Sequence, residues 1–135
     1  MSIVAYVAAL LVLLALDLLW FAVMGGSYRA ALGPLFAANV RWGAAALFYL
    51  LDVLGLMIFV MLPGRARGAS WVLLHGALFG LFTYAAHDLI SLAVMKGWTS
   101  EIAAADILWG MVASAVAALF GWAMMRDRAG ARRRR

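Results

Sequence analysis

Four aspartates lie inside long apolar stretches of the chain: Asp17, Asp52, Asp88 and Asp106. A carboxylate that is removed from water loses its hydration, so it is neutralised by a proton, a hydrogen-bond donor or a cation. Carboxyls held close together can also act as acid and base on a substrate. The candidate chemistries are therefore proton exchange, cation binding and acid–base catalysis.

The first and last of these acids stand in the same four-residue word. The sequences ALDLLW at residues 15–20 and AADILWG at residues 104–110 both contain Asp-aliphatic-Leu-Trp. At helical spacing each Trp lies one turn from its Asp. Trp109 is expected either to form the aromatic wall of a cavity that binds a cation or simply to pack. The repeated word suggests internal pseudo-symmetry, as in repeat-built transporters.

A polar strip surrounds the third acid. Helical spacing predicts that it is formed by Thr83, Tyr84, His87, Asp88 and Ser91. With the other acids, the predicted ligand-binding residues are Asp17, Asp52, Tyr84, His87, Asp88, Ser91, Asp106 and Trp109. If the protein is an enzyme, its predicted catalytic residues are Asp17, His87, Asp88 and Asp106.

The two histidines do not predict a metal site. His75 would lie about 18 Å from His87 along one helix, and the chain has no cysteine. We expect no bound metal and no cofactor, since the sequence also carries no nucleotide-binding loop.

The elements that must position these residues are membrane-spanning helices. The chain is 68% hydrophobic with a mean hydropathy of +1.01, too apolar for 135 residues to bury in one soluble core. Apolar runs at about 3–24, 42–62, 70–95 and 101–125 each have the length of about 20 residues that crosses a bilayer. The sequence predicts an all-α integral membrane four-helix bundle, one domain over residues 1–125, followed by a basic tail at 126–135.

Small residues indicate where two of these helices approach closely. Gly76 and Gly80 have the small-xxx-small spacing that lets another helix pack against them. Gly110, Ser114 and Ala118 form a similar stripe on the last helix.

The basic residues predict the orientation. Of the eleven Lys and Arg residues, only Arg29, Arg41 and Lys96 fall on one side of the four runs, and the other eight fall on the side of the tail. The positive-inside rule then places both termini in the cytoplasm. At 1.5 Å per residue, three acids lie roughly 8–11 Å below the outer boundary and Asp52 about 15 Å below it. This pattern predicts a polar cavity open to the outside, with residues 25–41 as a lid or a plain interfacial connector.

The words ALDLLW, YRAALGPL, HDLISLAVMKGW and DILWG, in this order, resemble a family of small bacterial four-helix membrane proteins, domain of unknown function 2177. The resemblance covers the chain to about Met125. It implies a multi-pass protein of the bacterial inner membrane and supplies no mechanism. In the family a Tyr often precedes the Asp of the third helix and an Asn follows it. Here His87 and Ser91 take those positions, and Asp52 is less typical.

Three functions remain open. The first is binding or transport of a small cation or a cationic amphiphile, proton-coupled because carboxyls at one depth repel one another. The second is a membrane enzyme doing isomerisation or cyclisation on a lipid or isoprenoid. The third is a structural or assembly subunit of a membrane complex. The expected partners are the lipid bilayer, the ligand and a second copy of the chain in a homodimer. Nucleic acid is not an expected partner, because no aromatic platform accompanies the basic tail.

Overall fold

The computed structural model describes residues 3–35 and 39–133, with side chains described as far as Arg126. The elements are α1 (Ile3–Leu32), η1 (Gly33–Leu35), α2 (Trp42–Leu56), the π-helix η2 (Met57–Met61), α3 (Leu62–Gly64), α4 (Ala69–Val94) and α5 (Ser100–Arg133). Four helical stretches are long and apolar enough to cross a membrane, and no strand occurs in the described ranges. The all-α membrane fold is confirmed. Part of the predicted lid and the end of the tail lie outside the described residues.

The first helix is longer than expected. The apolar run predicted an end near Met24, but α1 continues through Gly25 and Gly26 to Leu32. Glycine lowers helix stability by about 1 kcal/mol relative to Ala without ending the helix. Packing of Tyr28, which is buried, holds the added turns in place. The helix ends at Gly33, whose φ of +50° an L-residue side chain disfavours.

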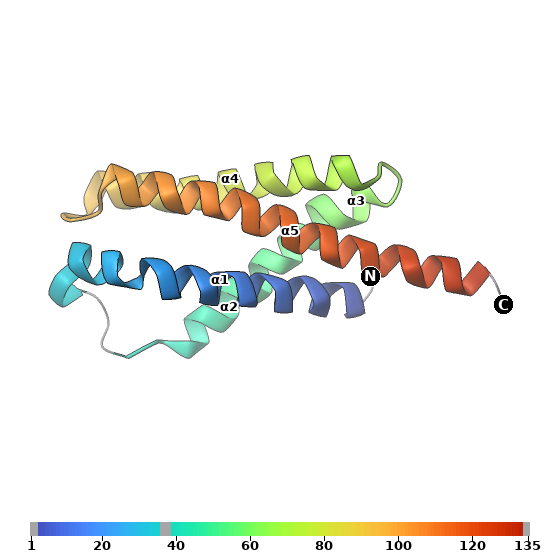
Figure 1. The fold of residues 1–135 in the computed structure, drawn as a ribbon, viewed down its shortest axis with the longest axis horizontal. Helices are drawn as coiled ribbons and strands as arrows, with labels where there is room; N and C mark the ends of the chain where they lie inside the picture. Colours follow the sequence, from blue (N-terminus) through green and yellow to red (C-terminus); the bar gives the residue numbers. More distant parts are fainter. Residues whose placement is uncertain (1–2, 36–38, 134–135) are drawn as a thin grey trace.

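α5 is the central helix of the bundle. It packs along the lengths of α4 and α1, whereas α2 runs obliquely across the other helices (Figure 1). A Cβ added to Gly80 would lie 2.1 Å from the carbonyl oxygen of Gly110, and one added to Gly76 would lie 2.8 Å from the Cα of Ala115. The predicted close approach of the small-residue stripes of α4 and α5 is therefore confirmed.

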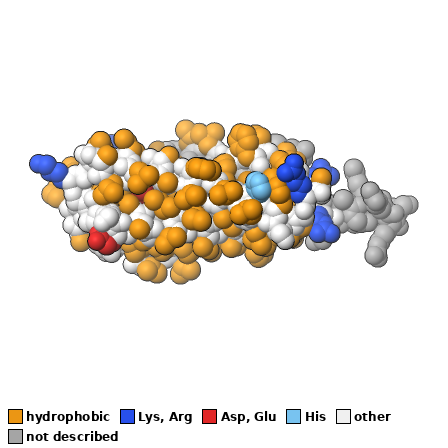
Figure 2. Space-filling model, turned by 90° about the horizontal axis from the view of Figure 1, so that it is seen from above, with side chains coloured by type: hydrophobic (Ala, Val, Ile, Leu, Met, Phe, Trp, Pro, Cys, Tyr) orange, Lys and Arg blue, Asp and Glu red, His pale blue; other side chains and the backbone are white. Residues whose placement is uncertain are grey.

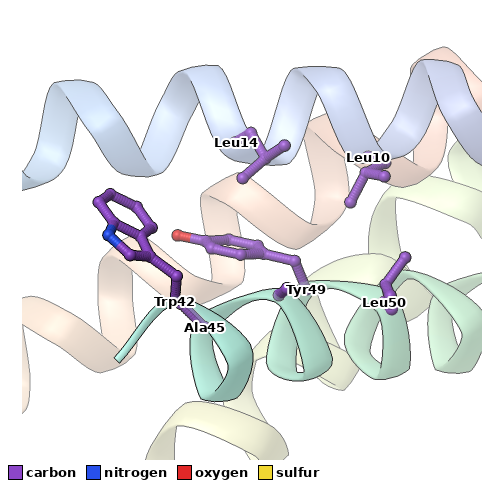
Figure 3. Close-up of a pocket in the computed structure, with 7 residues that line it drawn as sticks. Leu10, Leu14, Trp42, Ala45, Tyr49 and Leu50 are labelled. Carbon is purple, nitrogen blue, oxygen red and sulfur yellow. The ribbon is translucent and has the colours of Figure 1, made fainter. Parts of the chain in front are cut away.

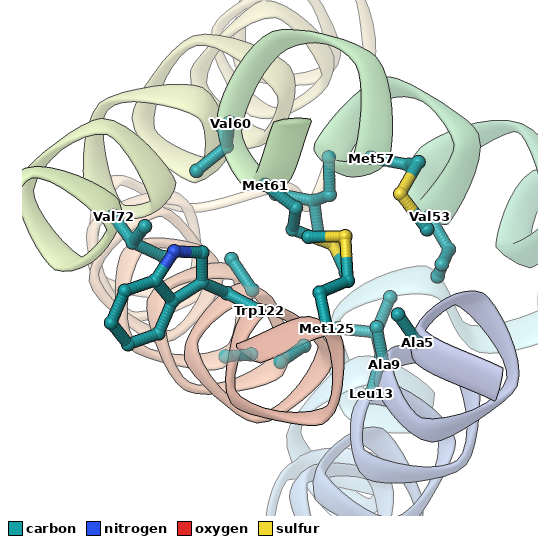
Figure 4. Close-up of a cluster of buried hydrophobic side chains, with 14 residues drawn as sticks. Ala5, Ala9, Leu13, Val53, Met57, Val60, Met61, Val72, Trp122 and Met125 are labelled. Carbon is teal, nitrogen blue, oxygen red and sulfur yellow. The ribbon is translucent and has the colours of Figure 1, made fainter. Parts of the chain in front are cut away.

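The hydrocarbon core occupies the half of the bundle nearer the chain termini. Small side chains of α1 (Ala5 and Ala9) face Met57 and Met61 of the π-helix (Figure 4). Trp122 is buried in the same cluster and donates a hydrogen bond from Nε1 to the carbonyl oxygen of Gly64, at 2.9 Å. This bond ties α5 to the end of the α2–η2–α3 span.

The two ends of the bundle differ in charge. The end that holds both termini and residues 65–68 is here called the proximal end, and the end that holds residues 29–41 and 95–101 is called the distal end. Lys and Arg side chains gather at the proximal end, while hydrophobic side chains cover the flank between the ends (Figure 2). An apolar flank between polar ends is the surface expected of a membrane-spanning bundle.

Candidate functional site

One buried stripe of α1 carries the first acid. Ala5, Ala9, Leu13 and Asp17 follow at intervals of four residues, and all are buried. The carboxyl therefore stands where a core residue would stand, facing the other helices. The other three acids are equally enclosed, and the exposed fractions are 5% for Asp17, 7% for Asp52, 0% for Asp88 and 7% for Asp106.

The two copies of the Asp-aliphatic-Leu-Trp word, one in α1 and one in α5, form hydrogen bonds with each other. Trp109 Nε1 donates to Asp17 Oδ1 at 3.1 Å, and Trp20 Nε1 donates to Asp106 Oδ1 at 2.9 Å. The two indoles stack, with ring centroids 4.7 Å apart and planes 9° apart. Because α1 and α5 are antiparallel (Figure 1), each word supplies the acceptor for the other word's donor. The predicted pseudo-symmetry is thus seen in these paired contacts between the two words.

Asp88 and Asp106 form the distal carboxyl pair. Asp106 accepts hydrogen bonds from the hydroxyl of Tyr28 and the indole of Trp20, and Asp88 accepts one from Trp98 Nε1 at 3.2 Å. The two carboxyls also interact electrostatically with each other. Ionised carboxylates accept hydrogen bonds but do not donate them, so a hydrogen bond between the two would require a proton on one of them.

Aromatic rings cover the distal pair. Tyr28 stacks on Trp98 with centroids 5.8 Å apart and planes 6° apart. A Cβ added to Gly97 would lie 2.1 Å from the carbonyl oxygen of Ala31, so the α4–α5 connection rests directly on the last turn of α1. The sequence predicted a cavity open at this end. In this conformation the distal pair is instead closed over, because α1 continues about two turns further than expected.

Asp17 and Asp52 form the central carboxyl pair, which interacts electrostatically across α1 and α2. Tyr49, one turn before Asp52, interacts electrostatically with Asp17. The Oδ2 atom of Asp52 is buried and has no hydrogen-bond partner. Asp88 Oδ2 is also buried and accepts no hydrogen bond from an N–H or hydroxyl group. Each pair therefore retains one acceptor oxygen that the protein's donors do not satisfy.

A groove of about 380 Å³ opens between α1 and α2 beside the central pair. Its lining residues are Leu10, Leu14, Trp42, Ala45, Ala46, Tyr49 and Leu50. The ring of Tyr49 lies in the gap between the two helices (Figure 3). The groove walls are hydrocarbon except for this phenol, which connects the groove to Asp17.

The structure brings together most of the residues that the sequence selected. Tyr84 lies across Gly110, where an added Cβ would be 2.2 Å from the Tyr84 Cγ, and it interacts electrostatically with Asp17, Asp52 and Asp106. Ser91 is buried on the face of Asp88. Trp109 bonds to Asp17 and so belongs to the cluster.

His87 does not join this cluster. Its side chain is exposed, and its ring meets the edge of Trp98 with centroids 6.1 Å apart. Thr83 also leaves the strip, because its hydroxyl donates back to the carbonyl of Phe79 in its own helix at 3.0 Å. Consecutive helix residues point about 100° apart, so Asp88 is buried while His87 is exposed, although both contact Trp98. The prediction of one continuous strip was therefore wrong at these two residues.

Sequence reasoning missed four side chains of the site: Trp20, Tyr28, Tyr49 and Trp98. A tryptophan near the end of a span is typical of a membrane–water interface, yet Trp20 and Trp98 each donate to a buried carboxyl. Tyr28 fell in an expected loop. A signal existed in its spacing, since it lies eleven residues, or three helical turns, after Asp17.

The fold and this cluster define a class: small membrane proteins whose four spanning helices enclose carboxyl groups. The chain belongs to the family described as "Predicted membrane protein (DUF2177)", whose model matches residues 2–123. No curated protein and no solved structure matched the chain. Among the described residues, no group of three or more His, Cys, Asp or Glu side chains is placed to hold a metal ion.

Proposed function

We propose that this protein binds a cation, or the cationic group of an amphiphile, at its buried carboxyls and exchanges it for protons, as a membrane binding or transport protein. The observation that carries the proposal is the pair of unsatisfied buried oxygens, Asp52 Oδ2 and Asp88 Oδ2. In the hydrogen bonds described above, Asp17, Asp88 and Asp106 meet only neutral donors: the indoles of Trp20, Trp98 and Trp109 and the phenol of Tyr28.

The composition of the helices supports a cation as the ligand. No Lys or Arg occurs in residues 3–28, 42–64, 69–95 or 100–125, the stretches that hold the acids. A buried acid without a basic partner is neutral when it holds a proton and anionic when it does not. A cation and a proton therefore compete for the same oxygens, which couples ligand binding to proton release.

The orientation and the membrane are part of this proposal. Eight of the eleven basic residues lie on the proximal side, which the positive-inside rule assigns to the cytoplasm. The distal end then faces the periplasm, and the protein lies in the bacterial inner membrane with both termini inside. A homodimer would provide more helices for a transport pathway than the four-helix bundle has alone.

The test is proton release on cation binding. Purified protein in weakly buffered detergent is titrated with methylammonium while a pH indicator reports released protons. Affinity is expected to rise with pH, by up to about tenfold per unit for each proton displaced. Asp17→Asn and Asp106→Asn should each weaken binding and flatten this dependence.

Glu101→Gln is the matched control, because Glu101 is an exposed acid at the distal end. It should bind as the wild type does. Unchanged binding and unchanged proton release in both aspartate variants would rule out the proposed site.

The enzyme hypothesis is the second candidate, and one observation favours it. The groove between α1 and α2 brings hydrocarbon surface next to the phenol of Tyr49, which interacts electrostatically with Asp17, and a phenol coupled to a carboxyl can serve acid–base chemistry on a lipid. An exposed His87 is a poor general base for that groove, so His87→Ala should leave turnover of a lipid substrate intact. Loss of turnover in His87→Ala would mean that His87 takes part in the reaction.

A further inference from the structure

The proximal end carries two arginines that lie over tryptophan rings. The Cζ atom of Arg67 is 5.2 Å from the centre of the Trp71 ring, and that of Arg126 is 4.9 Å from the centre of the Trp122 ring. A cation at this distance from an indole face is attracted by the charge distribution of the ring. Both arginines are exposed, and stacking on a ring leaves the N–H groups at the edge of a guanidinium able to donate.

Gly64 holds the two indoles beside each other. A Cβ added to Gly64 would lie 3.4 Å from Trp71 Cε3 and 3.5 Å from Trp122 Cδ1, so both rings lie against the same glycine. Its carbonyl oxygen accepts hydrogen bonds from the backbone N–H of Arg67 at 3.1 Å, from that of Gly68 at 3.0 Å and from Trp122 Nε1 at 2.9 Å. The connection between α3 and α4 is therefore tied to α5, and the two arginines project from one connected assembly.

The charge at this end is positive. Arg65 is exposed in the same connection, and Arg65, Arg67 and Arg126 are here called the proximal basic cluster. The acids whose side chains the structure describes lie in the spans or, for Glu101, at the distal end. The remaining acid, Asp127, has a side chain outside the described residues, and residues 65–67 and 126–135 contain eight arginines against this one acid. The ligand that such a cluster favours is an anion.

A hydrocarbon surface begins next to the cluster. Leu74 lies one turn after Trp71 on α4 and is 58% exposed, and Leu78, one turn further, is exposed as well. The whole flank between the two ends of the bundle is covered by hydrophobic side chains (Figure 2). A soluble anion would contact only the arginines. An anionic phospholipid would use both surfaces, with its phosphate at the arginines and its acyl chains along the leucines.

We infer that the proximal basic cluster binds the phosphate of an anionic phospholipid, to which Arg67 and Arg126 donate from their positions over the two indoles. The planar guanidinium fork matches a pair of phosphate oxygens. Tryptophan rings at the level of lipid head groups are typical of membrane–water interfaces, and here they also fix the arginines in place. This site goes beyond the proposed function and does not depend on it, because the buried carboxyls take no part in it.

The experiment counts lipids bound to the full-length protein by native mass spectrometry, over a titration in one detergent. The probes are dioleoyl phosphatidylglycerol and dioleoyl phosphatidylcholine, which share their chains and their phosphate and differ in net charge. The wild type is expected to bind phosphatidylglycerol at least about tenfold more tightly, because the choline ammonium offsets the phosphate charge. Inorganic phosphate at millimolar concentration should not displace the bound lipid, because it lacks the chains.

Arginine variants at the two ends of the bundle locate the site. Arg67→Gln and Arg126→Gln should each weaken phosphatidylglycerol binding about fivefold. Arg41→Gln is the matched control, because Arg41 is an exposed arginine next to a tryptophan, Trp42, at the distal end. It removes the same charge and should leave binding unchanged. Circular dichroism and thermal melting check folding, and Arg65→Gln replaces Arg126→Gln if that variant does not fold.

Each other outcome overturns one part of the inference. Equal losses in Arg41→Gln and Arg67→Gln would mean that net charge acts without a site. Equal binding of the two lipids would overturn the anionic head group, and displacement by inorganic phosphate would overturn the lipid in favour of a soluble anion. Methylammonium binding should be the same in all these variants. A change in it would overturn the independence of this site from the buried carboxyls.

Discussion

The two carboxyl pairs use the same residue type in opposite settings. The distal pair, Asp88 and Asp106, is supplied with donors by Trp20, Tyr28 and Trp98 and is covered by stacked rings. The central pair, Asp17 and Asp52, receives one indole hydrogen bond, from Trp109 to Asp17, and interacts electrostatically with Tyr49, which lines the groove between α1 and α2. The difference shows that an intramembrane acid pair gains a structural role when neighbouring helices supply it with several donors. A pair that receives few donors is held less firmly by its surroundings and is more available to a ligand.

The largest expected effect comes from removing one acid of each pair. Asp106→Ala leaves the donors of Tyr28 and Trp20 without an acceptor in the interior, and each buried unsatisfied group costs about 1–3 kcal/mol. The free energy of unfolding in detergent should therefore fall by about 2–5 kcal/mol. Asp52→Ala should be within about 1 kcal/mol of the wild type, because Asp52 Oδ2 has no partner to lose.

Denaturant titration of both alanine variants followed by circular dichroism measures this contrast. Equal losses in the two variants would mean that the pairs do not differ in their structural role.

A smaller effect is expected from matched tyrosines. Tyr28→Phe removes a hydroxyl that donates to Asp106, and should lower the free energy of unfolding by about 1–2 kcal/mol. Tyr49→Phe, at the half-buried edge of the groove, should lower it by less than about 1 kcal/mol while weakening methylammonium binding. Parallel thermal unfolding and binding measurements test the comparison. A Tyr49→Phe protein that binds normally but unfolds more readily than Tyr28→Phe would reverse it.

The smallest effect concerns the contact that joins the two pairs. Trp20→Phe and Trp109→Phe each remove one indole hydrogen bond, worth about 1 kcal/mol, while keeping an aromatic ring for the stack. A double-mutant cycle should give a coupling energy of at least about 0.5 kcal/mol, as residues in contact usually do. Simple additivity of the two losses would show that the pairs act independently.

The membrane fold could be predicted from the sequence because length and hydropathy suffice for it. Four apolar runs and the small-residue stripes at Gly80 and Gly110 gave the spans and one close interface correctly. The end of α1 could not be predicted. Gly25 and Gly26 favour a turn by local propensity, and only the contacts of Tyr28 in the folded bundle oppose that preference.

The four acids could be selected from the sequence because a carboxyl in an apolar run has few explanations, and the structure buries all four. Their partners were harder to predict, since an indole at a span end suits both a lipid interface and a hydrogen bond to an acid. Trp98 donates a hydrogen bond to an acid, Asp88. The two residues are ten positions apart and are separated by a loop, whose path cannot be predicted from helical spacing. The prediction that His87 belongs to the site was wrong for a local reason. Its neighbour Asp88 points into the bundle, so His87 points outward.

The even distribution of the acids, one in each spanning helix, also bears on how the protein is made. A membrane-integral chain is inserted segment by segment, and an Asp at a helix centre opposes insertion by about 2.5–3.5 kcal/mol. A helix with one such residue and an otherwise apolar run still partitions into the bilayer, whereas two in one helix would favour its being left in water. The site is therefore assembled from parts that can each enter the membrane alone. It becomes a site only when the last helix, α5, meets α1 and α4.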